Sequence, residues 1–279
     1  MSIKKEKITA PLRKYVIYHF IRKILKDPLW WWAKHFENKK LRLMKDIHKD
    51  RKRCFIIGNG PSINHHDLTK LKDEITFVTN GFVLHKEYKR IDPSYYCITD
   101  CKLFSDGDFS MLFRAIADSD LDTKIFFPLG SRKQIKQNAI LKQDSVLFLD
   151  FVHRPIWEIN KINLDITKGV YSGETIIIHF CLPLAYYMGF ETIYLLGCDC
   201  NLGQCTTETK KDRHFYKNSE HIGSEQTDEY HKTYWLNRVI TSYRIAKEAF
   251  EAAGRKIYNA GYNGQLEVFE RVNYEDLVQ

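Results

Sequence analysis

Residues 54–62 read CFIIGNGPS, in which four apolar residues pass directly into a loop with two glycines. The apolar run predicts a short strand buried on both faces, the kind found in parallel sheets. Gly58 and Gly60 allow a tight turn and let a ligand approach the backbone without meeting a Cβ. Free amides in such a loop can hold a phosphate. The first candidate nucleotide site is therefore Gly58, Asn59, Gly60, Pro61 and Ser62.

This loop follows neither of the two common phosphate-binding patterns. The dinucleotide fingerprint needs a third glycine, and the Walker loop needs Gly-Lys-Ser/Thr. A Gly-x-Gly sequence after a strand is often only a turn, so the loop needs support from the rest of the chain.

The rest of the chain repeats the pattern of short apolar runs separated by helical segments. Strands are predicted at 75–79, 95–99, 124–127, 146–149, 193–196 and 256–259, and helices at 174–188 and 230–253, the second ending at Gly254. The apolar (44%) and charged (28%) fractions are those of an ordinary globular protein. The sequence thus predicts a Rossmann-like α/β domain: a mostly parallel central sheet with helices on both faces.

Polar residues follow three more of these strands. Asn80 and Asp100 come after the second and third, and Asp199 follows Leu-Leu-Gly-Cys. Ligands of open parallel sheets bind at the carboxyl ends of the strands. We expect these residues to converge with the glycine loop on one crevice.

A second glycine-containing turn opens the helix predicted at 174–188. Its residues Ser172, Gly173, Glu174 and Thr175 form a candidate phosphate or carboxylate site. A simple helix cap is the plain alternative.

The polar stretch 201–228 interrupts the alternation and is interpreted as an active-site lid. It carries His214, a candidate general base. A surface or packing role for this histidine is the alternative. Cys198, Cys200, Cys205 and His214 also raise the question of zinc, but the spacing C-x-C-x4-C lacks the usual C-x2-C pair. We expect no metal site.

The basic charge is concentrated at the N-terminus. Residues 1–53 hold 17 of the 43 Lys+Arg and 5 of the 35 Asp+Glu, which leaves 26 against 30 in the rest. The main domain therefore lacks the charge of a nucleic-acid groove. An anionic membrane is the better partner for the basic segment.

The N-terminal segment also has the pattern of a membrane-surface helix. Residues 11–26 place apolar side chains on one face among cations, and Trp30, Trp31, Trp32 and Phe36 follow. We expect residues 11–36 to contact an anionic membrane. Packing onto the domain or onto a second subunit is the alternative, and a homo-oligomer stays open. The predicted division is an arm at 1–52 and a nucleotide-binding domain at 53–279.

No apolar run of 18 residues and no signal-peptide pattern occurs in the sequence. The dispersed cysteines are typical of a reducing compartment. We therefore expect a cytoplasmic protein.

Taken in order, the motifs FIIGNGPS (55–62), Asn80, Tyr-x-x-x-Asp100, Ser172-Gly173 and IYLLGCD (193–199) carry a family resemblance. Over about residues 53–260 the chain resembles the bacterial lipooligosaccharide sialyltransferases. It resembles equally the hydroxymethylpterin diphosphokinase-like domains, which include flagellin glycosylation factors.

The resemblance to sialyltransferases implies a glycosyltransferase that moves sialic acid or a related acidic sugar from a CMP-sugar to a cell-surface glycan or glycolipid. It implies donor binding by Asn59, Asn80 and Ser172-Gly173. His214 would be the general base of an inverting reaction, and Tyr216 would stabilise the leaving phosphate. No cofactor is required on this interpretation, and the protein would lie on the inner face of the bacterial inner membrane.

Two other functions fit the same residues. The first is a pyrophosphokinase-like enzyme that acts on a small alcohol and needs Mg²⁺ at carboxylates such as Asp100 and Asp199. The second is a non-catalytic nucleotide-binding subunit of surface-glycan assembly.

Overall fold

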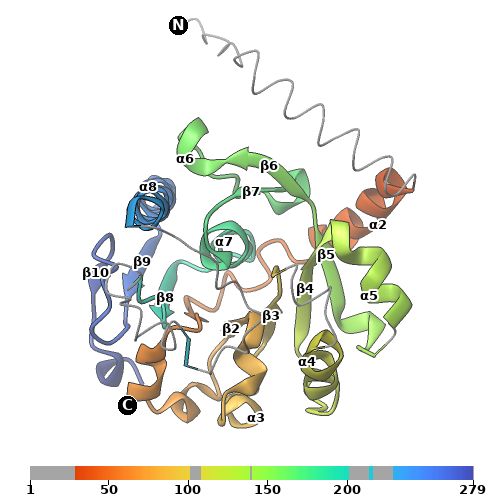
Figure 1. Ribbon diagram of the computed structural model, residues 1–279, viewed down its shortest axis with the longest axis horizontal. Coiled ribbons are helices and arrows are strands. Elements are labelled where there is room, and N and C mark those ends of the chain that lie inside the picture. The colour runs from red at the N-terminus through yellow and green to blue at the C-terminus, as the bar shows by residue number, and fades with distance from the viewer. Residues whose placement is uncertain (1–28, 101–107, 139, 201–213, 216–228, 279) are drawn as a thin grey trace, which may run out of the picture.

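The computed structural model describes residues 29–100, 108–138, 140–200, 214–215 and 229–278. At its centre lies an eight-stranded sheet in the order β10-β9-β8-β1-β2-β3-β4-β5 (Figure 1). The strands are β1 (Arg53–Ile57), β2 (Thr76–Thr79), β3 (Tyr95–Cys97), β4 (Lys124–Pro128), β5 (Val146–Leu149), β8 (Thr192–Leu196), β9 (Lys256–Asn259) and β10 (Glu270–Arg271). Every neighbouring pair is parallel. The predicted α/β fold is confirmed.

The direction of chain progression reverses beside β1. Strands β2 to β5 follow it on one side, whereas β8 to β10 lie on the other. β1 and β8 pair in register from Arg53↔Thr192 to Ile57↔Leu196. The loops after these two strands therefore leave the sheet at its topological switch point, where ligands of this fold class bind.

Alternating residues of β1 face two different cores. Cys54 and Ile56 pack with α7 (Leu182–Tyr187) and α8 (Glu229–Glu251). Phe55 and Ile57 pack with α3 (Tyr88–Ile91) and α4 (Asp108–Ala117) on the opposite face. Figure 1 shows the two helix layers on either side of the sheet. Burial on both faces explains why these strands read as continuous apolar runs.

A small second sheet pairs β6 (Phe151–Pro155) with β7 (Val170–Ser172) and carries Ser172. Our sequence interpretation did not contain it, because all of its residues except the buried Val170 are only partly buried, and they include polar side chains. The remaining helices are α5 (Arg132–Asn138) and α6 (Ile156–Ile159). The short 3-10 turns are η1 (Pro61–His65), η2 (Leu68–Leu71), η3 (Asn80–Leu84), η5 (Leu129–Ser131), η6 (Gln143–Ser145), η7 (Ile166–Lys168) and η10 (Tyr274–Asp276).

The helix predicted at 174–188 contains a π-helical turn, η8 (Ile177–Cys181), directly before α7. Pro183 lies in the first turn of α7. A proline there has no N–H to bond the carbonyl four residues back, and its ring crowds that carbonyl. The backbone therefore widens at His179, and such widened turns occur often at functional sites.

Helix α2 (Trp30–Arg42) packs against the edge strand β5. Trp30, Ala33 and Leu41 are buried, and the Lys34 ammonium lies 2.8 Å from the Asp150 carboxylate. The folded unit therefore includes residues before 53. The helix predicted at 11–26 lies outside the described residues. Among those described, no helix has the length and apolar character needed to cross a bilayer.

Candidate functional site

The loops after β1 and β8 contact each other through glycine backbone. Gly58 donates its amide to the Leu196 carbonyl at 2.8 Å, and Gly60 donates to the Gly197 carbonyl at 2.9 Å. A Cβ on Gly58 would lie 2.5 Å from the Gly197 oxygen. Glycine is therefore required here for close packing between the loops. The amides of Gly58 and Gly60 are engaged within the fold rather than free for a phosphate, which corrects the sequence interpretation at these two positions.

Asp199 supports the glycine loop from β8. Its buried carboxylate accepts a hydrogen bond from the Ser62 amide at 3.0 Å and another from the Ser62 hydroxyl. A Cβ on Gly60 would lie 2.5 Å from the same carboxylate. Both carboxylate oxygens thus hold the loop, and Asp199 acts as an internal support.

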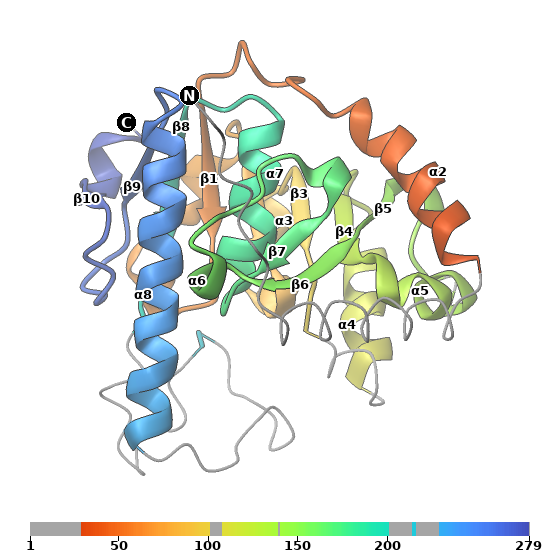
Figure 2. The same cartoon turned by 90° about the horizontal axis from the view of Figure 1, so that it is seen from above.

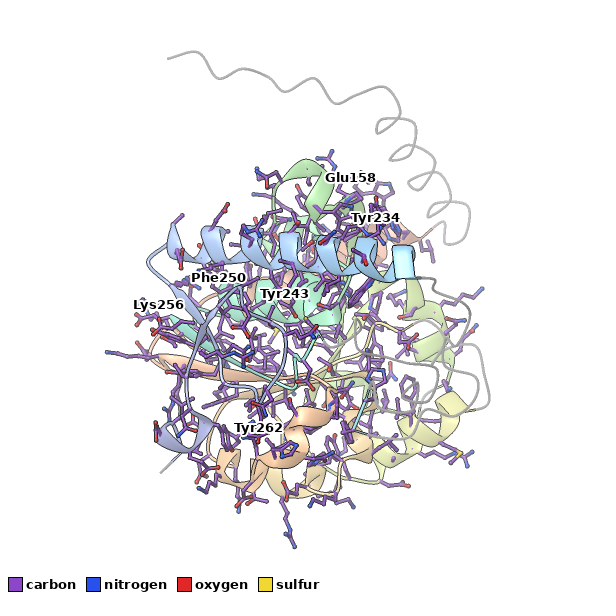
Figure 3. The ribbon with its side chains drawn as sticks, turned by 60° about the vertical axis from the view of Figure 1, so that its left-hand side comes forward. Glu158, Tyr234, Tyr243, Phe250, Lys256 and Tyr262 are labelled. Atoms are coloured by element: carbon purple, nitrogen blue, oxygen red, sulfur yellow. The ribbon has the colours of Figure 1, made fainter. Side chains whose placement is uncertain are left out.

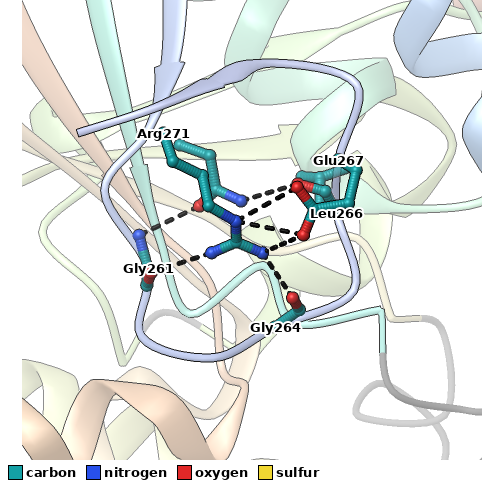
Figure 4. A network of polar contacts seen from close by, with 6 residues as sticks. Gly261, Gly264, Leu266, Glu267 and Arg271 are labelled. Atoms are coloured by element: carbon teal, nitrogen blue, oxygen red, sulfur yellow. Dashed lines mark hydrogen bonds and ion pairs between the residues drawn. The ribbon is translucent and has the colours of Figure 1, made fainter.

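The loop after β9 closes the other side of Asp199. Gln265 donates its amide to the Asp199 carbonyl at 2.7 Å. The Arg271 guanidinium holds this loop together by donating to the carbonyls of Gly261 and Gly264 and to the Glu267 carboxylate (Figure 4).

Two aromatic rings border this cluster. Tyr262, on the loop after β9, stacks on His65 of η1 with 4.3 Å between ring centroids. Figure 3 places Tyr262 beside this part of the chain, far from the α8 residues Tyr234 and Tyr243. Tyr262 is 47% exposed, so one aromatic surface remains accessible next to the glycine loop.

His214 and Phe215, the described residues of the predicted lid, lie against the glycine loop. Phe215 donates its amide to the Asn59 carbonyl at 2.9 Å, and its ring meets those of Phe82 and His85 edge-on. His214 is half-buried. The backbone contact therefore brings the predicted general base to the predicted nucleotide loop. Tyr216 lies outside the described residues.

Asn59 carries an unsatisfied acceptor at this place. Its Nδ2 donates to the Thr79 carbonyl at 3.0 Å, which fixes the amide plane between β1 and β2. Its Oδ1 is buried and accepts no hydrogen bond from the described residues. A buried acceptor without a donor is unfavourable, and a ligand hydroxyl or amino group would satisfy it.

Asn80 connects the ends of β2 and β3. It has a left-handed backbone, with φ of 40°. Its Oδ1 accepts a hydrogen bond from the Thr99 amide at 3.1 Å, and its carbonyl accepts one from the Tyr96 hydroxyl. Asp100 follows Thr99 and is half-buried. The predicted convergence of Asn80 and Asp100 is therefore found at this edge.

His179 joins this strand end to the turn at Ser172-Gly173. Its Nδ1 donates to the Gly173 carbonyl at 3.0 Å, which leaves Nε2 to accept from the Thr99 hydroxyl at 3.4 Å. Burial lowers the pKa of His179 to about 4, so the ring is neutral near pH 7. Sequence analysis missed His179, although Pro183 four residues later marks the widened turn.

Glu174 and Thr175, in contrast, contact α8. The Glu174 carboxylate lies 2.9 Å from the Arg238 guanidinium, and the Thr175 hydroxyl lies 3.5 Å from that of Tyr243. Arg238 also lies over the ring of Trp157, 4.9 Å from its centroid. These contacts give Glu174 and Thr175 partners on α8, while the N-cap of the following helical turn, Ile176, has no side-chain capping hydrogen bond.

Residues 31–204 match the family described as 6-hydroxymethylpterin diphosphokinase MptE-like. The chain belongs to this family. The matched residues include the glycine loop, Asn80, His179 and Asp199, whereas His214 follows them. No curated protein matches the chain. The family match agrees with the second of the two resemblances in the sequence.

The described part of this MptE-like chain contains no group of three His, Cys, Asp or Glu side chains placed to hold a metal ion. Cys198 and Cys200 are free thiols, and Cys205 lies outside the described residues. Burial raises the pKa of Cys200 to about 12, so this thiol is protonated near pH 7.

Proposed function

We propose that this MptE-like protein is a nucleotide-dependent transferase that moves a sugar from a CMP-sugar onto a hydroxyl of a surface glycan. The hydrogen bond from the Phe215 amide to the Asn59 carbonyl carries this proposal, because it brings the residue next to His214 into contact with the glycine loop, the predicted nucleotide site. The unsatisfied Asn59 Oδ1 supports it as well. It would accept from a ribose hydroxyl or from the amino group of cytosine.

The reaction would proceed in one displacement. The acceptor hydroxyl gives its proton to an unprotonated nitrogen of His214 while its oxygen bonds to the anomeric carbon. The bond from that carbon to the CMP phosphate oxygen breaks on the opposite face, so the configuration inverts. The leaving phosphate keeps the bonding electrons. Tyr216 and the cations of the lid would stabilise its charge.

Diphosphate transfer from ATP to a small alcohol is the second candidate, because the family description names a diphosphokinase. Such transfer normally uses Mg²⁺ held by carboxylates. Asp199 is buried and each of its carboxylate oxygens already accepts a hydrogen bond from Ser62, so its structural role is the one that these contacts support. Asp100 alone remains from the predicted pair, and we derive no step through a metal.

Turnover and nucleotide binding of His214→Ala test the proposal. We expect CMP-sugar hydrolysis or transfer to fall by about 100-fold or more, while CMP affinity changes little, because the base acts only in the chemical step. His35→Ala is the matched control, since His35 is exposed on α2. It should keep wild-type turnover.

Two results would contradict the transferase. Unchanged turnover in His214→Ala would remove His214 from the mechanism. Diphosphorylation of a hydroxymethylpterin from ATP, abolished by EDTA and without any CMP-sugar turnover, would establish the second candidate instead.

A further inference from the structure

The outer face of α2 exposes large apolar side chains. Trp31 is 56% exposed, Trp32 65%, Phe36 55% and Leu43, just after the helix, 80%. Trp32, Phe36 and Leu43 are spaced by four and seven residues, so they form one stripe along the helix. Trp30, on the inner face, is only 5% exposed. The tryptophan triplet is therefore divided between the domain core and the surface.

The charge on this face has one sign. Within residues 29–45 the only acidic residue is Glu37, which is buried on the inner face. Lys39, Lys40 and Arg42 are exposed around the apolar stripe, and the Lys39 ammonium lies 5.8 Å from the centroid of the Phe36 ring. Among residues 29–45 the outer face thus combines aromatic rings and cations without an exposed carboxylate, and the first exposed one, Asp46, follows this segment.

The helix holds this face in a fixed position. Trp30 and Ala33 anchor α2 in the core, and Lys34 pairs with Asp150 at the end of β5. Figures 1 and 2 both show α2 next to β5, at the opposite end of the row of strands from α8. The exposed stripe therefore lies on a helix that packs against the edge strand β5.

The composition distinguishes a lipid surface from a protein partner. Lysine is depleted in the centre of protein interfaces, whereas lysine beside tryptophan and phenylalanine is typical of helices at the membrane surface. Anionic lipids attract nearby cations, and the rings settle at the level of the headgroups. Residues 1–28 add eight Lys+Arg against two Asp+Glu.

We propose that the outer face of α2, formed by Trp31, Trp32, Phe36 and Leu43 with the surrounding cations, binds an anionic lipid bilayer. The proposal is independent of the reaction proposed at the carboxyl ends of the strands. The bilayer would hold the domain at the membrane through a rigid part of its own fold.

Cosedimentation of the full chain with vesicles tests this proposal. Wild-type protein should bind vesicles of phosphatidylglycerol and phosphatidylcholine, bind pure phosphatidylcholine much more weakly, and lose affinity as salt rises. In the triple variant Trp31→Ser, Trp32→Ser, Phe36→Ser, affinity for the anionic vesicles should fall by about tenfold or more.

The double variant Leu84→Ser, Met111→Ser is the matched control, because these apolar residues are 56% and 70% exposed elsewhere on the surface. It should bind like wild type.

A second variant tests whether the two exposed tryptophans enter the bilayer without removing the apolar stripe. The double variant Trp31→Phe, Trp32→Phe should still bind vesicles. The blue shift of tryptophan fluorescence that wild type shows on adding vesicles should be largely lost. Wild-type affinity in the serine variant would overturn the proposal. Equal binding to neutral and anionic vesicles would do the same. A dimer that the serine variant converts to a monomer, without vesicle binding by wild type, would assign the face to a second copy of the chain.

Discussion

Two clusters at the carboxyl ends of the strands are built in different ways. The glycine cluster, Gly58, Gly60 and Gly197 with Asp199, is held by backbone contacts too close for a Cβ. The histidine bridge, made of Asn80, Thr99, Gly173 and His179, is held by side-chain hydrogen bonds. Packing therefore dictates the residue types of the first cluster. The second depends on polar groups and on their protonation. Substitutions should accordingly affect the two clusters through different physical terms.

The largest effect is expected for Gly197→Ala in the glycine cluster. Gly197 has φ of 62°, and a Cβ there would lie 2.4 Å from the Ile63 side chain and 2.6 Å from the Gly58 carbonyl. Neither the backbone angle nor the contacts suit alanine, so we expect the free energy of unfolding to fall by about 4 kcal/mol or more. Urea denaturation measures the change.

Gly254→Ala is the matched control for this substitution. Gly254 has φ of 72°, but a Cβ there meets no atom within 4 Å. Its free energy of unfolding should fall only by the cost of placing alanine in a left-handed backbone conformation, about 1 kcal/mol. Equal losses of unfolding free energy in the two variants would mean that the backbone angle, and not close packing, determines why glycine is needed in this cluster.

The histidine bridge should respond to pH instead. Desolvation lowers the pKa of His179 to about 4, below the value of roughly 6.5 expected in the unfolded chain. The unfolded state therefore binds an additional proton between these values. The stabilisation is complete above pH 6.5 and is lost as the pH falls toward 4, by about 3 kcal/mol. Urea denaturation of wild type at pH 7.5, 6, 5 and 4.5 follows it.

His179→Gln separates this effect from other titrations. Burial also lowers the pKa of His48, His66 and His85, so the wild-type curve contains their contributions. Glutamine keeps polar atoms at the site but does not titrate. The stability difference between wild type and variant should therefore shrink from pH 7.5 to 4.5. A difference independent of pH would contradict the role assigned to His179.

The sequence predicted the parts of the fold that depend on burial. The apolar runs at 54–57 and 193–196 became β1 and β8, because strands buried on both faces need continuous apolar residues. The half-buried strands β6 and β7 lack that pattern, so sequence analysis missed them. Their position depends on the packing of distant segments.

The site was predictable in place but less so in the roles of its residues. Gly58, Asn59, Asn80 and Asp199 all lie at the sheet edge, as the strand ends indicated. Periodicity could not show that Ser62 occupies the Asp199 carboxylate, since this contact spans 137 positions in the chain. The contact of His179, on η8, with Thr99 likewise spans 80 positions in the chain.

The smallest effect is expected for Asn80→Gly, which tests whether the bridge extends to β2. Glycine accepts the φ of 40° found at Asn80 but removes the acceptor of the Thr99 amide. Losing that hydrogen bond should reduce the free energy of unfolding by about 1 kcal/mol. Under the proposed function Asn80→Gly should also weaken CMP binding several-fold.

Asn160→Gly is the control, because Asn160 has φ of 48° and is exposed at the end of α6. It should leave both quantities almost unchanged, since glycine suits this backbone equally well. If Asn80→Gly were equally neutral, the bond to Thr99 would contribute nothing, and the histidine bridge would reduce to His179 and its two partners.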